Sequence, residues 1–323
     1  MIILSKRKVV IALGGNAILT TDSSAKAQQE ALQQTADYLV RFVENGDAIA
    51  ISHGNGPQVG NLLLQQEAAN SSKNPAMPLD TCVAMTQGSI GYWMQSALSK
   101  ALQEKGLNQS TASVVTQVVV SEDDPAFEEP TKPVGPFLSE EEARRQMQET
   151  ETLFIEDAGR GWRKVVPSPR PVAIREEKVI RLMMDHDMIP ITVGGGGIPV
   201  IKREGDYIGV EAVIDKDFAS ETLAASLGAD LLVILTGVDH VMVNYKQEDE
   251  VKLEGVSVEE MKAYITEEQF AAGSMLPKVE AAIRFVEQRP SGKAIITSLE
   301  NIEAALKENG GTIITSERQL IQS

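Results

Sequence analysis

The sequence of 323 residues predicts an α/β sandwich in which helices cover both faces of a parallel sheet. Three observations predict this fold class. Runs rich in apolar β-branched residues recur along the chain, several of them are apolar throughout, and segments with helical periodicity lie between them. A strand that is covered on both faces has no polar side, so a continuous apolar run is typical of a parallel sheet. Alternation of strands and helices is typical of α/β proteins.

Seven runs are predicted strands because they are short, apolar and bounded by polar residues or glycine. They are residues 9–13 (VVIAL), 47–52 (DAIAIS), 112–121 (ASVVTQVVVS), 188–193 (MIPITV), 230–236 (DLLVILT), 293–298 (KAIITS) and 311–315 (GTIIT).

Four segments between these strands are predicted helices. The first has apolar residues three, four or seven positions apart, and each of the four stops at a glycine or before a proline, which are common helix ends. They are residues 27–46, 217–230, 277–290 with Pro277 in its first turn, and 299–311.

Residues 122–175 break the alternation of strands and helices. A stretch rich in proline and acidic residues comes first, and a charged helix with Ser139 as its N-cap follows. A second stretch, at 158–174, is rich in proline and arginine. We predict an ordered excursion that projects from the main sheet; the alternative is a solvated linker.

Composition excludes several functional classes. The formal net charge of -16 would repel a nucleic-acid backbone. No apolar run approaches the roughly 18–20 residues that span a bilayer, and the first residues do not resemble a secretory signal. Cys82 is the single cysteine, so no intrachain disulfide forms, and we expect a cytoplasmic protein in which Cys82 is a buried apolar residue rather than a reactive thiol.

Three glycine-rich stretches, ALGGNAI (12–18), SHGNGPQVG (52–60) and VGGGGIPV (193–200), follow predicted strands. Ligands of open parallel sheets bind beyond the carboxyl ends of the strands, and glycine lets backbone N–H groups approach an anion there. Asn16 and Asn55 add side-chain donors. None of the stretches matches a P-loop or a dinucleotide fingerprint. We favour phosphate binding; the alternative for each stretch is a tight turn.

Three lysines stand in contexts that suit phosphoryl transfer, which depends on positioning and on neutralising charge. Lys216 lies between Asp215 and Asp217, Lys132 lies between two prolines, and Lys278 lies at a predicted helix start. A cation at a helix N-terminus is unfavourable unless an anion sits beside it. The alternative for each lysine is a solvated charge.

The histidines His53, His186 and His240 have no metal-ligand spacing, and no Ser-His-Asp or Cys-His arrangement can be inferred from the sequence. His53 lies within a glycine-rich stretch, where it either contacts substrate or packs the loop. His186 and His240 are expected to be structural or exposed.

The motifs VVIALGGNAIL, SHGNGPQVG, PTKPVGPF, GWRKVVPSPRP, VGGGGIPV, GVEAVIDKDFASETLA, LTGVDHVMVNY and GSMLPKVEAA resemble, in this order, those of the carbamate kinases in the amino acid kinase superfamily. The resemblance runs from about residue 8 to residue 315. It implies a three-layer αβα sandwich with an open, mainly parallel sheet of about eight strands. It implies an N-terminal lobe (1–190) for the acceptor, with a protruding lid at about 126–175, and a C-terminal lobe (191–323) for the nucleotide.

The resemblance implies reversible phosphoryl transfer between ATP and carbamate, which gives ADP and carbamoyl phosphate, in a homodimer. Mg²⁺ would be held mainly by oxygens of ATP or ADP, so no metal site formed by residues of the protein is expected. We expect ATP formation in arginine or purine/allantoin-type nitrogen catabolism. The alternatives are a kinase of the same superfamily for another small carboxylate, and a non-catalytic nucleotide sensor. Retention of the three lysines speaks against a sensor.

The resemblance also implies roles for individual residues. The residues implied to bind phosphate and the acceptor are Gly14, Gly15, Asn16, Gly54 and Asn55. The residues implied to be catalytic are Lys132, Lys216, Lys278 and Asp217. Nucleotide binding falls to Gly195, Gly196, Asp215, Asp239, Tyr245 and Met275. Related kinases usually carry a lysine before the first glycine pair, where this chain has Ala12 or Leu13. Lys132 of the lid is expected to replace it.

Overall fold

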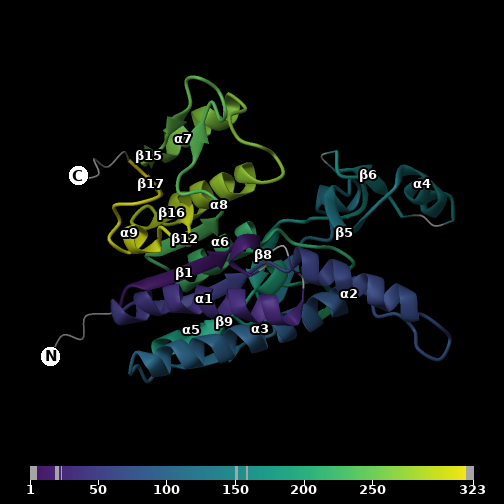
Figure 1. The fold of residues 1–323 in the computed structure, drawn as a ribbon, viewed down its shortest axis with the longest axis horizontal. Helices are drawn as coiled ribbons and strands as arrows, with labels where there is room; N and C mark the ends of the chain where they lie inside the picture. The colour runs from purple at the N-terminus through teal and green to yellow at the C-terminus, as the bar shows by residue number, and fades with distance from the viewer. Residues whose placement is uncertain (1–5, 19–21, 23, 150–151, 158, 318–323) are drawn as a thin grey trace.

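The computed structural model describes residues 6–317 except 19–21, 23, 150–151 and 158, together with the backbone but not the side chains of Asn16 and Pro136. Its centre is an eight-stranded sheet in which neighbouring strands run parallel, except β16 and β17 (Figure 1). From edge to edge the strands are β15 (Gly255–Ser257), β17 (Thr312–Thr315), β16 (Lys293–Ser298), β12 (Leu231–Thr236), β1 (Lys8–Leu13), β2 (Ala48–His53), β9 (Met188–Ile191) and β3 (Ser110–Ser113).

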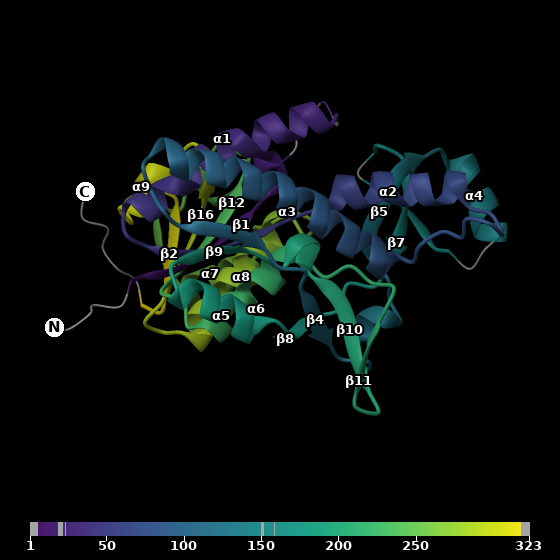
Figure 2. The same ribbon diagram turned by 90° about the horizontal axis from the view of Figure 1, so that it is seen from below.

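Helices cover both faces of this sheet, as Figure 2 shows from below. One apolar core lies between the sheet and α1 (Ala25–Glu44), α3 (Leu79–Glu104) and α9 (Ile302–Leu306). The other lies between the sheet and α5 (Glu177–Asp185), α6 (Lys216–Leu227), α7 (Val258–Thr266) and α8 (Met275–Gln288). Side chains of alternate strand residues enter opposite cores: Val9 and Ile11 enter one, and Val10 and Ala12 enter the other. The predicted αβα sandwich is confirmed.

A second, four-stranded sheet stands beside the main one. Its order is β11 (Asp206–Gly209), β10 (Ile198–Arg203), β4 (Gln117–Val120) and β8 (Pro171–Ile174). The strand predicted at 112–121 is therefore wrong as a single element, because β3 and β4 belong to different sheets. Between them, Thr116 donates its N–H to Gln87 Oε1 at 2.8 Å instead of continuing the ladder.

A small subdomain projects from this body (Figure 1). It consists of the three antiparallel strands β5 (Lys132–Leu138), β7 (Trp162–Val166) and β6 (Phe154–Glu156), with α4 (Glu140–Glu149) beside them. Ser139 accepts a hydrogen bond from the Glu142 N–H, as expected of an N-cap. The small sheet ends at Val166, and β8 already belongs to the body, so the projection is narrower than residues 126–175.

The remaining elements are α2 (Gly56–Ala69), the short strand pair β13 (Met242–Val243) and β14 (Val251–Lys252), and the 3-10 turns η1 (Gly15–Ala17), η2 (Pro125–Phe127) and η3 (Gly194–Gly196). Prediction missed α2, α3, α5 and α7, and the helix predicted over 299–311 is only the five residues of α9. Cys82 on α3 is fully buried, as predicted. None of the helices in the described part of the chain has the length and apolar content of a bilayer-spanning helix.

Candidate active site

The carboxyl ends of β1 and β2 open into a cavity of about 230 Å³. Because Leu13 pairs with His53 in register, the glycine stretches that follow the two strands begin side by side. Gly15, Gly54 and Gly195 all line the cavity, so the three glycine-rich stretches meet there. The prediction that these stretches gather at one end of the sheet is confirmed by their placement.

Three helices begin at the cavity wall. Gly56 opens α2, Lys216 opens α6, and Ser274 precedes the first residue of α8; all three residues line the cavity. The first N–H groups of a helix have no partner within it, and the N-terminal end carries a partial positive charge. The cavity therefore presents several backbone donors and the positive ends of three helix dipoles to a bound anion.

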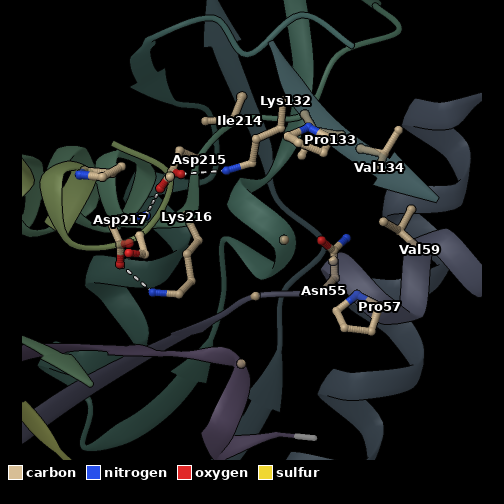
Figure 3. Close-up of a pocket in the computed structure, with 18 of the residues that line it drawn as sticks. Asn55, Pro57, Val59, Lys132, Pro133, Val134, Ile214, Asp215, Lys216 and Asp217 are labelled. Carbon is tan, nitrogen blue, oxygen red and sulfur yellow. Dashed lines mark hydrogen bonds and ion pairs between the residues drawn. The ribbon is translucent and has the colours of Figure 1, made fainter. Parts of the chain in front are cut away.

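The lysines predicted for catalysis, Lys132, Lys216 and Lys278, all line the same cavity, although they come from three distant segments. Figure 3 shows Lys132 and Lys216 with the aspartates beside them. Lys132 Nζ lies 2.7 Å from Asp215 Oδ2. Lys216 contacts Asp217 Oδ1, and Lys278 Nζ lies 3.0 Å from Asp217 Oδ2. One carboxylate thus holds two ammonium groups, and a second holds the lysine of the projecting subdomain.

Burial and charge set the ionisation of this network. Asp217 is 2% exposed. Burial acts to raise the pKa of Asp217, but the charges of Lys216 and Lys278 outweigh it and lower the pKa to about 2. Burial lowers the pKa of Lys216, while Asp217 acts in the opposite direction. Asp217 is therefore a carboxylate at neutral pH, and it holds the two lysines in place.

The two aspartates have different local tasks. Asp215 Oδ1 accepts a hydrogen bond from the Asp217 N–H at 2.9 Å and so caps α6. Its other oxygen faces Lys132. Both aspartates line the cavity, but Asp217 is the one that orients Lys216 and Lys278. Asp215, which we predicted to bind nucleotide, contacts the lysine of the subdomain.

Individual glycines have steric reasons for their positions. A Cβ on Gly14 would lie 2.5 Å from the Leu235 carbonyl oxygen, so Gly14 lets β1 leave the sheet close to β12. Gly14 lines a smaller neighbouring cavity rather than the main one. Gly196 has a φ of +89°, and its Cβ would lie 2.1 Å from the Ile214 carbonyl oxygen. Gly196 shapes the loop but does not line the main cavity.

The side chain of Asn16, which we predicted to bind phosphate or the acceptor, lies outside the described part of the chain.

A second cavity, of about 380 Å³, adjoins the first, and Ser274 lines both. Its lining is largely apolar and includes two of the predicted nucleotide residues, Tyr245 and Met275. Asp239, also predicted there, is not part of the lining: its carboxylate accepts a hydrogen bond from Ser298 Oγ. An apolar cavity joined to a lysine-rich one suits a ligand with a flat apolar end and a phosphate end.

His53 packs the loops and does not line the cavity. It is 1% exposed, and its Nδ1 lies 2.8 Å from the Gly54 carbonyl oxygen. A Cβ on Gly194 would lie 2.6 Å from the ring. Burial lowers the pKa of His53 to about 4, so the ring is neutral at neutral pH. The loop-packing alternative is the one that the geometry favours.

Sequence reasoning missed several residues around the two cavities. Phe270 and Ala271 line the apolar cavity, and Ser274 joins the two. On α3, Thr86 contacts Asn55, and Gln87 Nε2 donates to the Gly194 carbonyl oxygen at 3.0 Å. No motif marks Thr86 or Gln87. The available signal was two adjacent polar residues within an apolar stretch, which indicates a buried polar contact.

No cluster of three or more histidine, cysteine or acidic side chains in the described ranges could hold a metal ion. The two carboxylates of the cavity are already paired with lysines. This donor set would fit a divalent cation only if phosphate oxygens of a bound ligand supplied most of its coordination.

Comparison with known proteins shows the family of the chain. A model of the Amino acid kinase family matches residues 7–298. The carbamate kinase of Lentilactobacillus hilgardii is 58% identical over 96% of this chain and 98% of its own length, and carbamate kinase 1 of Enterococcus faecium is 59% identical over 96% and 99%. A solved carbamate kinase from Giardia lamblia, bound to AMP-PNP, is 42% identical with a TM-score of 0.90, covering 96% of this chain and 99% of that one.

The fold and the site define a phosphoryl-transfer enzyme built on an open α/β sheet, and the chain is a kinase. It belongs to the amino acid kinase family, within the group of the carbamate kinases.

Proposed function

We propose that the protein catalyses reversible phosphoryl transfer between ATP and carbamate, giving ADP and carbamoyl phosphate. The observation that carries the proposal is the convergence of Lys132, Lys216 and Lys278 on one small cavity beside three helix N-termini. Carbamate and the transferred phosphoryl group are both small and anionic, so bringing them together requires positive charge on several sides. The carbamate kinases that resemble this chain over nearly their full length support the choice of acceptor.

In this reaction an oxygen of carbamate attacks the γ-phosphorus of ATP, and the bond from that phosphorus to the bridging oxygen breaks to release ADP. The attacking oxygen is already anionic, so no general base is required. Lys216 and Lys278, fixed by Asp217, would neutralise the equatorial oxygens from the nucleotide side. Lys132 would approach from the projecting subdomain. Mg²⁺, when bound, neutralises charge on the nucleotide phosphates.

ATP formation from ADP tests the proposal directly. Purified protein with Mg²⁺ and ADP is given carbamoyl phosphate, acetylglutamyl phosphate or aspartyl phosphate, and ATP is measured by a coupled assay. We expect the carbamoyl compound to be the preferred donor. Absence of ATP with carbamoyl phosphate would reject this function, and preference for one of the others would identify a different kinase of the family. Loss of turnover on chelation checks the requirement for Mg²⁺.

We further propose a homodimer. Met85 and Tyr92 lie seven positions apart on α3, hence on one face, and both are exposed. Two exposed apolar side chains on one helix face can form part of a contiguous apolar patch, and such patches mark interaction sites. Sedimentation should give twice the chain mass of 34.9 kDa. Tyr92→Arg should shift it toward the monomer, and a monomeric wild type would contradict the proposal.

The cellular setting is also a proposal. We place the enzyme in the cytoplasm, in arginine or purine/allantoin-type nitrogen catabolism. We propose that it forms ATP there, because carbamoyl phosphate is an acid anhydride that readily phosphorylates ADP. A strain without the gene should lose ATP formation from carbamoyl phosphate in its cytosolic fraction. Unchanged activity in that fraction would refute this assignment.

A further inference from the structure

Asn55 occupies the N-cap position of α2 without capping the helix. An asparagine at this position usually accepts a hydrogen bond from a backbone N–H of the first turn. The Asn55 side chain makes no such bond. Its Nδ2 instead donates to Thr86 Oγ1 on α3 at 2.8 Å. Something other than helix capping therefore determines how this amide is held.

Thr86 fixes which end of the amide faces the cavity. The Thr86 hydroxyl donates its single hydrogen to the Val83 carbonyl oxygen at 2.7 Å, so it can only accept from Asn55. Thr86 is 2% exposed, which removes water as a competing partner. The amide nitrogen of Asn55 must point toward α3, and Oδ1 must point the other way.

Gly195 holds the amide from a second side. Gly195 has a φ of +66°, and a Cβ at this position would lie 2.2 Å from Asn55 Nδ2. Only glycine lets the loop lie against the amide this closely. In Figure 3 the Asn55 nitrogen is on the side of Val59, and the oxygen is on the side of Lys216.

Asn55 Oδ1 is an accessible acceptor in a cavity dominated by donors. Asn55 lines the cavity, and its Oδ1 has no hydrogen-bond partner among the described residues. This oxygen is not completely buried, so a ligand in the cavity can reach it. The two carboxylates nearby are paired with lysines. A fixed neutral acceptor in this setting recognises a substrate group that carries an N–H.

We propose that Asn55 Oδ1 accepts a hydrogen bond from the amino group of carbamate or carbamoyl phosphate, and that Thr86 is the positioning residue that presents this oxygen. The inference rests on the proposed function. An acetyl compound has a methyl group in place of the amino group, so it leaves Oδ1 unpaired inside the cavity. The Asn55–Thr86 pair thereby selects carbamoyl over acetyl substrates.

Thr86→Val tests the proposal, because valine keeps the shape of threonine but cannot accept a hydrogen bond. The measurement is the ratio of kcat/KM for carbamoyl phosphate to kcat/KM for acetyl phosphate, with ADP as acceptor. We expect Thr86→Val to lower this ratio about tenfold, the effect of one hydrogen bond to a substrate, with the KM for ADP unchanged. Thr86→Ser should restore the ratio, and Thr81→Val, which removes a hydroxyl elsewhere on α3, should not alter it.

A ratio that stays at the wild-type value in Thr86→Val overturns the proposal, and so does an equal loss with both phosphates. If Thr86→Val does not fold, Asn55→Ala removes the acceptor itself, and an undiminished ratio in that variant also overturns the proposal. Wild-type protein that forms no ATP from carbamoyl phosphate defeats the proposed function and this inference with it. Active wild type with an unaltered ratio in the variants defeats the inference alone.

Discussion

Lys132 Nζ lies 2.7 Å from Asp215 Oδ2, although Lys132 belongs to the projecting subdomain and Asp215 caps a helix of the main body. About a third of the lysine side chain (34%) is exposed, so water weakens this ion pair and it contributes little to stability. The contact therefore places Lys132 at the cavity but is weak, so an anionic ligand can replace the Asp215 carboxylate as the partner of the lysine.

This geometry predicts the effect of Lys132→Ala. We expect kcat to fall by about 100-fold or more, the usual effect of removing one charged donor from a transition state. Affinity for ADP should hardly change, because the apolar cavity lies on the other side of Ser274. Coupled ATP formation gives kcat, and calorimetry gives the dissociation constant of ADP. A parallel loss of ADP binding would contradict the role assigned to Lys132.

Lys216→Ala tests the charge network in the body. We expect turnover to fall by about 100-fold or more, while the protein still folds, because Lys278 continues to neutralise the buried Asp217 carboxylate. Lys202→Ala, at an exposed position on β10, is the matched control and should behave like wild type. Unchanged turnover in Lys216→Ala would favour the nucleotide sensor or a site elsewhere.

Much of the site could be predicted because the relevant residues are local in sequence. Asp215, Lys216 and Asp217 are neighbours, and their position at a helix start follows from the pattern around them. The pairing of Lys132 with Asp215 joins residues 83 positions apart. Only the arrangement of β5 against α2 and the body brings them together, and no local pattern encodes that arrangement.

Helix α3 could not be predicted from its periodicity because its buried face is not uniformly apolar. Thr86 and Gln87 are buried there to hold the glycine loops. Gly91 is required because a Cβ would lie 2.0 Å from Ser113 Oγ. Polar residues and glycine on a buried face weaken the apolar periodicity that predicts a helix. The residues that shape the site are therefore the same ones that made α3 hard to predict.

His53 predicts a pH dependence of stability. Its pKa is lowered to about 4 in the folded protein from 6.5. The unfolded chain therefore binds more protons between these values, and stability is complete above about pH 6.5 and is lost as the pH falls toward 4. The loss amounts to about 3 kcal/mol of unfolding free energy.

Urea unfolding at pH 7 and at pH 4.5 measures this effect. The wild type should lose more stability over this interval than His53→Asn, in which the replacing amide can still donate to the Gly54 carbonyl oxygen. His186→Asn, at an exposed helix end, should retain the wild-type pH dependence. Equal slopes for wild type and His53→Asn would show that His53 does not titrate in this range.

Ala271→Trp tests whether the apolar cavity binds ADP while the lysine-lined cavity binds carbamoyl phosphate. Ala271 lines the apolar cavity but is itself exposed, so an indole there fills the cavity without disturbing the core. We expect the KM for ADP to rise about tenfold, because the lost apolar contacts are worth about 1.4 kcal/mol. The KM for carbamoyl phosphate should stay nearly constant. Ala272→Trp is the matched control, since Ala272 is also exposed but does not line the cavity. A rise in the KM for carbamoyl phosphate alone would place the nucleotide outside this cavity.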